Sequence, residues 1–372
     1  MIKNCFRRRA VLPFLTVVFL SLAGCGCSAP DAGMGSAGGS IALLTWNVHN
    51  LFDGNDNGYE YDEYRESAGW STEKYLGRVN AISAAIGSID PTPDIILLQE
   101  LESLLILEDI AKSLNGNYFW CHFGDNFGAS LGIGVISRLP LLDAKAHSIT
   151  VGGDTTPRPA LEIRACYKKE DFIIFNCHWK SKIGGEDETE NIRMASARVI
   201  ARRISEIWKE EPGTGIIVAG DLNENHDEFY RRGADCIRAL LPDDPYCARL
   251  SGCIGEDGGD IAGARKDFIV ISKNRPPSPV HFPMGTVTMY SPWISEIANG
   301  SYFYQHDWET IDHFLISDQF FNNAGWEYEK TLVINNPGFV NANGIPVPYN
   351  PKTGAGLSDH LPLLLILKAA RD

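Results

Sequence analysis

The chain has 372 residues, 44% of them hydrophobic, with a formal net charge of −14 and a sequence pI near 5.1. Once an N-terminal segment is set aside, enough chain remains for one large α/β domain or two ordinary ones with a full core. The acidity argues against a protein that holds nucleic acid by charge alone, since such proteins usually carry a basic face. It leaves phosphate chemistry open, because a bound divalent cation supplies positive charge where it is needed.

The N-terminus has the pattern of an export signal. Residues 1–9 are basic, and the apolar run over residues 11–23 is too short to span a bilayer comfortably. The run ends in Leu22-Ala23-Gly24-Cys25, which resembles the cleavage box of bacterial lipoproteins, where the cysteine becomes the lipid-bearing first residue of the mature protein. An ordinary signal peptide with a chance cysteine is the alternative interpretation.

These features predict how the chain is organised. We expect a lipoprotein signal peptide over residues 1–24, a flexible tether rich in Gly, Ala and Ser over residues 25–40, and a globular domain over residues 41–372. The mature protein is then expected to be exported and anchored to the bacterial cell envelope by lipidated Cys25.

The first elements of the domain alternate between strand and helix. Residues 41–48 are typical of a buried strand with a polar residue at its end. Apolar residues then recur at spacings of three and four, which predicts an amphipathic helix that is capped by Ser71 or Thr72 and ends near residue 90. This helix leads to a second buried strand over residues 94–100, which ends in a carboxylate.

The middle of the chain is predicted to contain a helix over residues 102–114, a strand over residues 130–137, and a hairpin of residues 159–167 and 172–178. A long helix follows over about residues 189–208. Its inward side chains are expected to be Ile192, Ala195, Val199, Ile204 and Ile207. Its basic side chains are interpreted as a solvated face rather than a nucleic-acid track, and they are Arg193, Arg198, Arg202 and Arg203.

Further strands are expected over residues 216–220, 267–272 and 311–317, and an apolar strand that ends at Leu367 closes the chain. Strands outnumber helices in this pattern and mostly lack a helix between them. The pattern therefore favours a sandwich of mixed sheets with outer helices over one doubly wound sheet.

Three irregular stretches each have two interpretations. The acidic stretch over residues 53–63 is interpreted as a solvated turn, with a second cation site as the alternative. Cys236, Cys247 and Cys253 can form one disulfide in an oxidising compartment, and their spacing lacks the paired Cys-x-x-Cys of a zinc site. The aromatic segment over residues 289–304 is either a loop that packs over a site or a hairpin that touches a membrane.

Polar side chains gather at the predicted strand ends. Asp221 and Asn223 lie two residues apart, so on an extended backbone both point to the same side, where they can orient one water or one phosphate oxygen. The other strand ends offer Asn47, Glu100, His178, Asp312 with His313, and Asp359 with His360. Oxygen ligands without thiolates select a hard cation, Mg²⁺ with Mn²⁺ as the alternative. The imidazoles suit proton transfer at neutral pH, and Asp312 is a candidate to orient His360.

Six short motifs resemble those of a known family. They are Thr45-Trp46-Asn47-Val48, Gln99-Glu100, Asn176-Cys177-His178, Gly220-Asp221-Leu222-Asn223, Ile311-Asp312-His313 and Ser358-Asp359-His360. Their order and rough spacing resemble the endonuclease/exonuclease/phosphatase superfamily, which includes deoxyribonuclease I-like nucleases, abasic-site endonucleases, neutral sphingomyelinases and inositol-phosphate phosphatases. The resemblance covers nearly all of residues 41–367. It implies an α/β fold of four layers, in which two mixed β-sheets pack face to face with helices on the outside.

The resemblance also implies a metal site and a set of groups that handle water. It makes Glu100 the main metal ligand, with Asn47 and Asp359 beside it in the same site. Asp221 and Asn223 are expected to orient or activate the attacking water and to hold the phosphate as charge builds.

The resemblance also implies roles for two histidines. His360, supported by Asp312, is expected to contact the scissile phosphate and to take part in proton transfer. His178 stands where deoxyribonuclease I-like enzymes and sphingomyelinases carry a histidine and abasic-site endonucleases a tyrosine. Arg158 and Lys180 are candidate phosphate contacts. The other histidines are expected to be structural or solvent-facing, and they are His49, His122, His147, His226, His281, His306 and His313.

The chemistry that follows from this set is in-line attack of water on phosphorus. The leading interpretation is an exported, lipid-anchored, Mg²⁺-dependent phosphodiesterase, a monomeric nuclease that cleaves DNA or RNA. One alternative is a sphingomyelinase-type lipid phosphodiesterase that acts on a phospholipid head group. Another is a surface binding protein that kept the fold but lost turnover, although no expected catalytic position is substituted.

Overall fold

The structure is a computed structural model that describes residues 39–124, 128–253, 267–297 and 299–370. The predicted signal peptide, Cys25 and most of the tether lie outside these residues.

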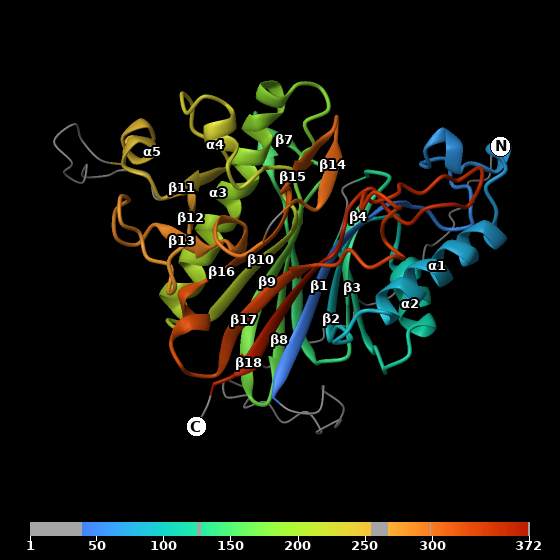
Figure 1. Cartoon of the computed structure of the whole chain (residues 1–372), viewed down its shortest axis with the longest axis horizontal. Coiled ribbons are helices and arrows are strands. Elements are labelled where there is room, and N and C mark those ends of the chain that lie inside the picture. The colour runs from blue at the N-terminus through green and yellow to red at the C-terminus, as the bar shows by residue number, and fades with distance from the viewer. Residues whose placement is uncertain (1–38, 125–127, 254–266, 298, 371–372) are drawn as a thin grey trace, which may run out of the picture. The chain divides into compact units, whose positions relative to one another are not determined.

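Two mixed sheets form the centre of the described chain (Figure 1). The first sheet has the strand order β17 (Trp326–Val333), β18 (Leu363–Ala369), β1 (Ser40–Leu51), β2 (Ile95–Leu101), β4 (Gly132–Ser137) and β3 (Trp120–Gly124). The second has the order β11 (Leu240–Pro242), β12 (Ile269–Ser272), β13 (Val287–Tyr290), β16 (Asp312–Ile316), β10 (Gly215–Asp221), β9 (Glu170–His178), β8 (Ala160–Tyr167) and β5 (Leu141–His147).

Helices and two small hairpins complete the described elements. The α-helices are α1 (Thr72–Gly87), α2 (Leu104–Ser113), α3 (Glu186–Glu210), α4 (Glu228–Arg231) and α5 (Pro245–Leu250). Single turns of 3-10 helix cover Asp62–Tyr64, Glu66–Ala68, Pro292–Ile294 and Asp318–Phe321. The hairpins are β6 (Thr150–Val151) with β7 (Asp154–Thr155), and β14 (Tyr302–Tyr304) with β15 (Asp307–Glu309). Within the described residues, no helix combines the length and the apolar character needed to cross a membrane.

The central strands are buried on both faces, which explains their nearly continuous apolar sequences. In β1, Ile41 and Leu43 face the core between the two sheets, whereas Ala42 and Leu44 face the core under α1 and α2. Helix α3 covers the outer face of the second sheet in the same way (Figure 1). The predicted α/β sandwich of two mixed sheets with outer helices is therefore confirmed.

Local sequence signals fix several element boundaries. Helix α1 begins after Ser71, whose side chain accepts a hydrogen bond from the Lys74 backbone N–H at 3.4 Å, so Ser71 is the cap. The predicted hairpin is formed by β8 and β9, but its turn is shorter than expected. Lys168 and Lys169 both have positive φ angles, 53° and 68°, as a two-residue turn that matches the twist of the strands requires.

One expectation about the side chains of α3 is wrong and another is confirmed in part. Arg193 is not part of a solvated face of α3, because its side chain is only 1% exposed and lies among buried carboxylates. On the inward face of α3, Ile204 and Ile207 are buried as predicted, together with Ala197 and Ile200. The other predicted inward residues are only half-buried, and they are Ile192, Ala195 and Val199. Cys236 and Cys247 are free thiols, with Cys236 exposed and Cys247 buried.

Candidate active site

The site continues the core between the two sheets. Side chains alternate along a strand, so a row that faces this core keeps facing the same way up to the strand end. In β1 the row that starts with Ile41 and Leu43 reaches Asn47, and in β10 the row of apolar residues reaches Asp221. Asp221 pairs in register with His178 of β9 on one side and with Asp312 of β16 on the other. The sheet registers thus bring together polar residues that are far apart in the sequence.

Gly220 allows this close packing of strands beneath the site. Its φ angle is +123°, and a Cβ added at this position would lie 2.0 Å from the carbonyl oxygen of Cys177 on the neighbouring strand. A glycine is therefore required immediately before Asp221.

The backbone around the site is held in an uncommon conformation. His49, Asn50, Glu100 and Asn223 all have positive φ angles, between 51° and 66°. Glu100 lies at an irregularity in the pairing of β2 with both of its neighbours, so its side chain leaves the regular alternation. Such backbone strain costs about 1–3 kcal/mol per residue and is concentrated at functional sites.

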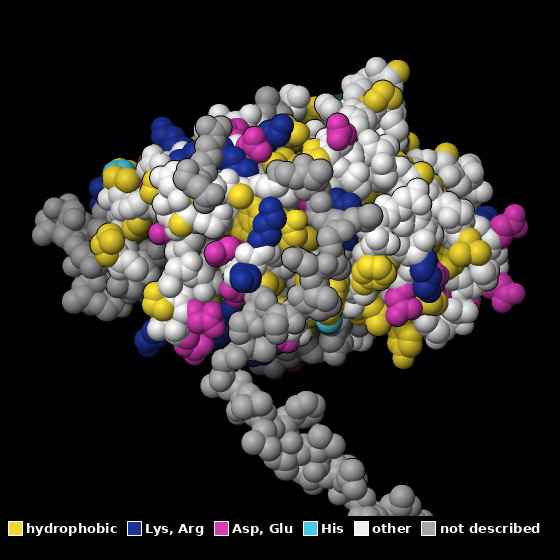
Figure 2. Space-filling model, turned by 90° about the horizontal axis from the view of Figure 1, so that it is seen from below, with side chains coloured by type: hydrophobic (Ala, Val, Ile, Leu, Met, Phe, Trp, Pro, Cys, Tyr) yellow, Lys and Arg dark blue, Asp and Glu magenta, His cyan; other side chains and the backbone are white. Residues whose placement is uncertain are grey.

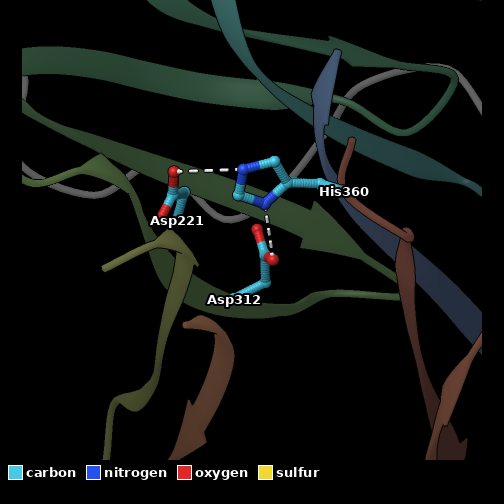
Figure 3. A group of neighbouring side chains, drawn as sticks. All are labelled: Asp221, Asp312 and His360. Carbon is cyan, nitrogen blue, oxygen red and sulfur yellow. Dashed lines mark hydrogen bonds and ion pairs between the residues drawn. The ribbon is translucent and has the colours of Figure 1, made fainter. Parts of the chain in front are cut away.

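A histidine lies between two carboxylates at the centre of the site (Figure 3). Nδ1 of His360 is 2.9 Å from Oδ2 of Asp312, and Nε2 on the other side of the ring is 4.0 Å from Oδ2 of Asp221. Oδ2 of Asp312 also accepts a 2.6 Å hydrogen bond from the Ser301 hydroxyl. The two bonds to Asp312 fix the orientation of the imidazole, so that Nε2 faces Asp221.

A second group joins the two sheets across the site. Nδ2 of Asn47 donates to Oε1 of Glu100 and to Oδ2 of Asp221, both at 3.0 Å. Nε2 of His178 is 3.7 Å from the same Glu100 oxygen and 3.5 Å from the same Asp221 oxygen. The other Glu100 oxygen accepts from the backbone N–H of Asn50 at 2.8 Å. Glu100, Asp221 and both predicted histidines therefore form one cluster.

The two histidines differ in protonation. Burial, with the nearby Arg158 as the next cause, holds the pKa of His178 well below its ordinary value. Burial also opposes charge on His360, but the carboxylates of Asp312 and Asp221 outweigh it and raise the pKa of His360 well above its ordinary value. His178 is therefore neutral and His360 charged at neutral pH, an arrangement that places a hydrogen-bonding group and a cation at one site.

Comparison with known proteins identifies the family to which this arrangement belongs. The model of the endonuclease/exonuclease/phosphatase family matches residues 40–234, which include four of the six motifs. The chain belongs to the endonuclease/exonuclease/phosphatase family. Members of this family are phosphodiesterase-type hydrolases that generally depend on a divalent metal. None of the curated proteins matches the chain.

Solved structures agree with the family at the level of the fold. Truncated TDP2 from Caenorhabditis elegans has a TM-score of 0.50 and 13% identity, with 89% of this chain and 98% of that chain covered. The human Nocturnin catalytic domain with a bound sulfate has a TM-score of 0.49 and 16% identity, covering 89% and 93%. A family protein from Bacteroides thetaiotaomicron has a TM-score of 0.46 and 17% identity, covering 89% and 95%. At 13% identity the likeness to truncated TDP2 shows the fold alone.

In this family member the clustered residues line a cavity of about 660 Å³. Its walls include Glu100, His178, Asp221, Asn223, Asp359 and His360. The backbone N–H of Asn223 donates to Oδ1 of Asp221 at 2.9 Å, and its side-chain amide donates to the Trp179 carbonyl at 3.2 Å. Asn223 thus orients Asp221 as well as facing the cavity.

The carboxylates on the cavity wall fit a divalent cation. Glu100 opens into the cavity, and Oδ1 of Asp359 is buried with no hydrogen-bond partner, as expected for an oxygen that has a ligand to hold. Asn47 was expected beside Glu100 in the metal site, but its side-chain oxygen is already used as an acceptor. The amide nitrogen faces the carboxylates, and the oxygen accepts from the His49 backbone N–H at 3.0 Å. Asp221, Asp312 and His360 also lie close enough together to hold an ion. Oδ2 of Asp312 is occupied by Ser301 and His360, whereas its Oδ1 is buried without a hydrogen-bond partner.

Of the two predicted phosphate contacts, Arg158 lines the cavity and Lys180 does not. Arg158 lines the cavity and donates to the Trp179 carbonyl. Lys180 instead donates to the carbonyls of Ser181 and Ile183 in its own loop, at 3.2 and 3.0 Å. Lys182, which no sequence motif marks, is the lysine on the cavity wall.

Other residues that support the site were also missed. Ser301 holds Asp312, and the Ser358 hydroxyl donates to the Asn47 carbonyl at 2.7 Å while it accepts from the His360 N–H at 3.0 Å. The Tyr302 ring packs against His360 with ring centres 4.6 Å apart and an angle of 32° between the planes. A serine one or two residues from a site residue is a weak signal, and nothing in the sequence connects residues 301 and 302 with His360.

The acidic stretch after β1 is exposed over residues 55–59 and 61–63, as the predicted solvated turn requires, but two of its carboxylates are buried. Asp53 and Glu60 are only 6% and 2% exposed. The Glu60 carboxylate accepts the backbone N–H groups of Asn57 and Gly58, and Glu102 accepts that of Asp53. These carboxylates are buried because they satisfy the loop's own backbone, and burial raises the pKa of Glu102 to about 7.

Proposed function

We propose that the protein is an exported, lipid-anchored, Mg²⁺-dependent phosphodiesterase that cleaves nucleic acid. The observation that supports this most directly is the position of His360 between Asp312 and Asp221 on the wall of a cavity that also contains Glu100 and His178. This is the set of groups needed to place a water, a phosphorus atom and a leaving oxygen in line.

Each side chain has its own role in the proposed reaction. Asp221, fixed by Asn47 and Asn223, positions and deprotonates the attacking water. His360, held by Asp312, stabilises the negative charge that builds on the phosphate oxygens. A cation held by Glu100 and Asp359 supplies Lewis-acid stabilisation of the same oxygens when it is bound.

Two observations favour nucleic acid over a lipid substrate. Met289, Tyr290 and Trp293 of the aromatic segment are buried, so they pack inside the protein and do not form a membrane-touching surface. The β14–β15 hairpin, which lies beside the cavity, has the polar residues Gln305 and His306 at its tip. A membrane-inserting hairpin would carry apolar residues there.

The surface charge is consistent with a substrate held mainly inside the cavity. On the face shown in Figure 2, basic and acidic side chains of the described residues are interspersed rather than gathered into one basic track. Most arginines of α3 are paired, with Arg202 bonded to Asp267 and Arg203 to Glu162. Binding is therefore expected to depend on the cavity more than on long-range attraction.

The proposed reaction predicts a strict metal requirement. Purified protein is expected to hydrolyse DNA or RNA with Mg²⁺, to lose activity in excess chelator, and to regain it when Mg²⁺ is restored. Glu100→Gln keeps the shape but removes a charge, so the Mg²⁺ concentration for half-maximal rate should rise by at least about 10-fold. The assay compares plasmid DNA, RNA, sphingomyelin and inositol phosphates. Turnover of sphingomyelin alone would refute the nuclease assignment, and full activity in chelator would refute the metal site.

The proposed anchor predicts where the protein is found. Because Cys25 would carry the lipid, Cys25→Ala should move the protein from the membrane fraction to the soluble fraction of cells and abolish labelling by a radioactive fatty acid. Cys27→Ala, two residues away, serves as the matched control and should leave both unchanged. Unaltered fractionation and labelling of Cys25→Ala would mean that the cysteine is not the anchor.

A further inference from the structure

An aromatic stack leads outward from the catalytic histidine. The rings of His360 and Tyr302 have centres 4.6 Å apart, and the rings of Tyr302 and Tyr304 follow at 6.1 Å with only 15° between their planes. All three residues line the cavity. Tyr304 is 50% exposed and lines the cavity, so the outer end of this row of rings is accessible to a ligand there.

The stack is fixed to the site by the backbone. Tyr302 forms a β-bridge with His360, and the Leu361 backbone N–H donates to the Ser301 carbonyl at 2.7 Å. The β14–β15 hairpin pairs Tyr302 with Glu309 and Tyr304 with Asp307. Because the hairpin and the catalytic histidine are joined in this way, the Tyr304 ring keeps a defined position relative to the reacting centre.

The cavity offers little positive charge for a chain of phosphates. Lys182 is 2.7 Å from Glu228 and 3.7 Å from Glu309, so its charge is already balanced. Arg158 forms no ion pair among the described residues, and Glu186 on the same wall is paired with Arg232 at 2.7 Å. One phosphate can be bound beside Arg158, but a duplex that is held by successive phosphates has no matching row of cations here.

We infer that Tyr304, supported by Tyr302, is a stacking platform for the unpaired nucleobase next to the scissile phosphate, and that the substrate is single-stranded nucleic acid. This inference rests on the proposed function. An aromatic face binds any base whose own face is free, and a base inside a duplex is not free to stack on a side chain. The nearly parallel rings of Tyr302 and Tyr304 present one flat face, whereas a cage for a quaternary ammonium head group needs rings that converge from different directions.

The test compares three variants on a single-stranded oligonucleotide. Tyr304→Ala should lower kcat/KM by about 5- to 150-fold, mainly through KM, which is the range that one base–aromatic stack supplies. Tyr304→Phe keeps the ring and should stay within about twofold of the wild type. Tyr246→Ala is the matched control, because Tyr246 has the same 50% exposure but lies on α5 and away from the cavity.

A second substrate isolates the base from the phosphate. On an oligonucleotide whose nucleotides around the scissile phosphate lack bases, wild type and Tyr304→Ala should have equal kcat/KM, and the wild type should cleave paired duplex more slowly than the free strand. If Tyr304→Ala cleaves the base-bearing strand as well as the wild type does, the stacking inference is wrong even though the nuclease assignment stands.

A binding measurement in an inactive variant tests the stacking platform without turnover. In an Asp221→Asn background, adding Tyr304→Ala should weaken binding of the single strand by the same about 5- to 150-fold. Equal binding with and without the Tyr304 ring overturns the stacking platform. A wild type that neither binds nor cleaves nucleic acid but hydrolyses sphingomyelin overturns the proposed function and this inference together.

Discussion

Asp221→Ala should lower kcat by about 10²- to 10⁴-fold, the range expected when a positioned general base is removed. The carboxylate is only 2% exposed and is fixed from several sides. Oδ1 accepts the Asn223 backbone N–H at 2.9 Å, and Oδ2 accepts the Asn47 amide at 3.0 Å. No other carboxylate in the cluster is held between Asn47 and His360 in this way, so nothing replaces it. The measurement is steady-state hydrolysis with saturating substrate and Mg²⁺.

The conservative variant separates chemistry from folding. Asp221→Asn keeps the size of the side chain and an acceptor oxygen for Asn223, so its thermal unfolding should stay close to that of the wild type while kcat falls in the same range. Asp143→Asn, an exposed aspartate on β5 of the same sheet, serves as the control for general effects of removing a charge. A normally active Asp221→Asn would exclude this carboxylate as the base.

Because His360 and Asp221 are proposed to act on one phosphate, their losses should not add. His360→Ala alone is expected to cost about as much as Asp221→Asn, and the double variant little more than either, since groups that act as a unit fail together. Full additivity of the two losses would indicate that the residues work in separate steps.

The strand-end residues could be placed from the sequence because strand periodicity is rigid. Once β10 is recognised as a strand, alternation puts Ile217, Ala219 and Asp221 on one face, and burial of the first two fixes which face that is. The same logic applies to His178 on β9 and Asn47 on β1. Periodicity does not show that these faces meet, and here the family resemblance supplied the missing information.

The loops that complete the site could not be placed by such reasoning. Ser301 and Tyr302 reach His360 through a loop whose path depends on the docking of the β14–β15 hairpin, and short-range patterns carry no information about that path. Edge strands were missed for a related reason. β3 and β17 each have one partner strand and exposed or charged positions, such as Trp120 and Lys330, so they lack the apolar run that marks β1 or β10.

The error at Arg193 shows the limit of helical periodicity. The basic residues of α3 have similar sequence surroundings, and only the fold brings Glu224 against one of them. The Arg193 guanidinium donates to Glu224 at 2.9 Å and to Glu190 at 2.7 Å, and it also bonds the Glu186 carbonyl at 2.8 Å. Lys180, whose carbonyl accepts from the same guanidinium at 3.2 Å, lies two residues after His178. The buried arginine thus links α3 to the loops that carry site residues.

Arg193→Met is therefore expected to destabilise the fold by about 3–5 kcal/mol, as breaking one side of a buried ion pair does. Glu224 is fully buried, and the loss of Arg193 leaves its carboxylate without a balancing charge. Burial already raises the pKa of Glu224 well above its ordinary value, and removing the cation raises it further. The folded variant then binds more protons than the unfolded chain, so its stability should fall as pH rises. Urea unfolding at about pH 5 and about pH 8 measures both effects.

The same helix offers a matched control. Arg202 is paired with Asp267 but its side chain is 58% exposed, so Arg202→Met should cost no more than about 1 kcal/mol. Replacing Arg193→Met together with Glu224→Gln should recover part of the stability, because Glu224 then carries no charge, whereas Glu190 still lacks its ion-pair partner. If Arg193→Met and Arg202→Met cost the same, the buried network does not stabilise the site loops. If the double variant is no better than Arg193→Met alone, the loss comes from packing of the arginine side chain and not from the charge left on Glu224.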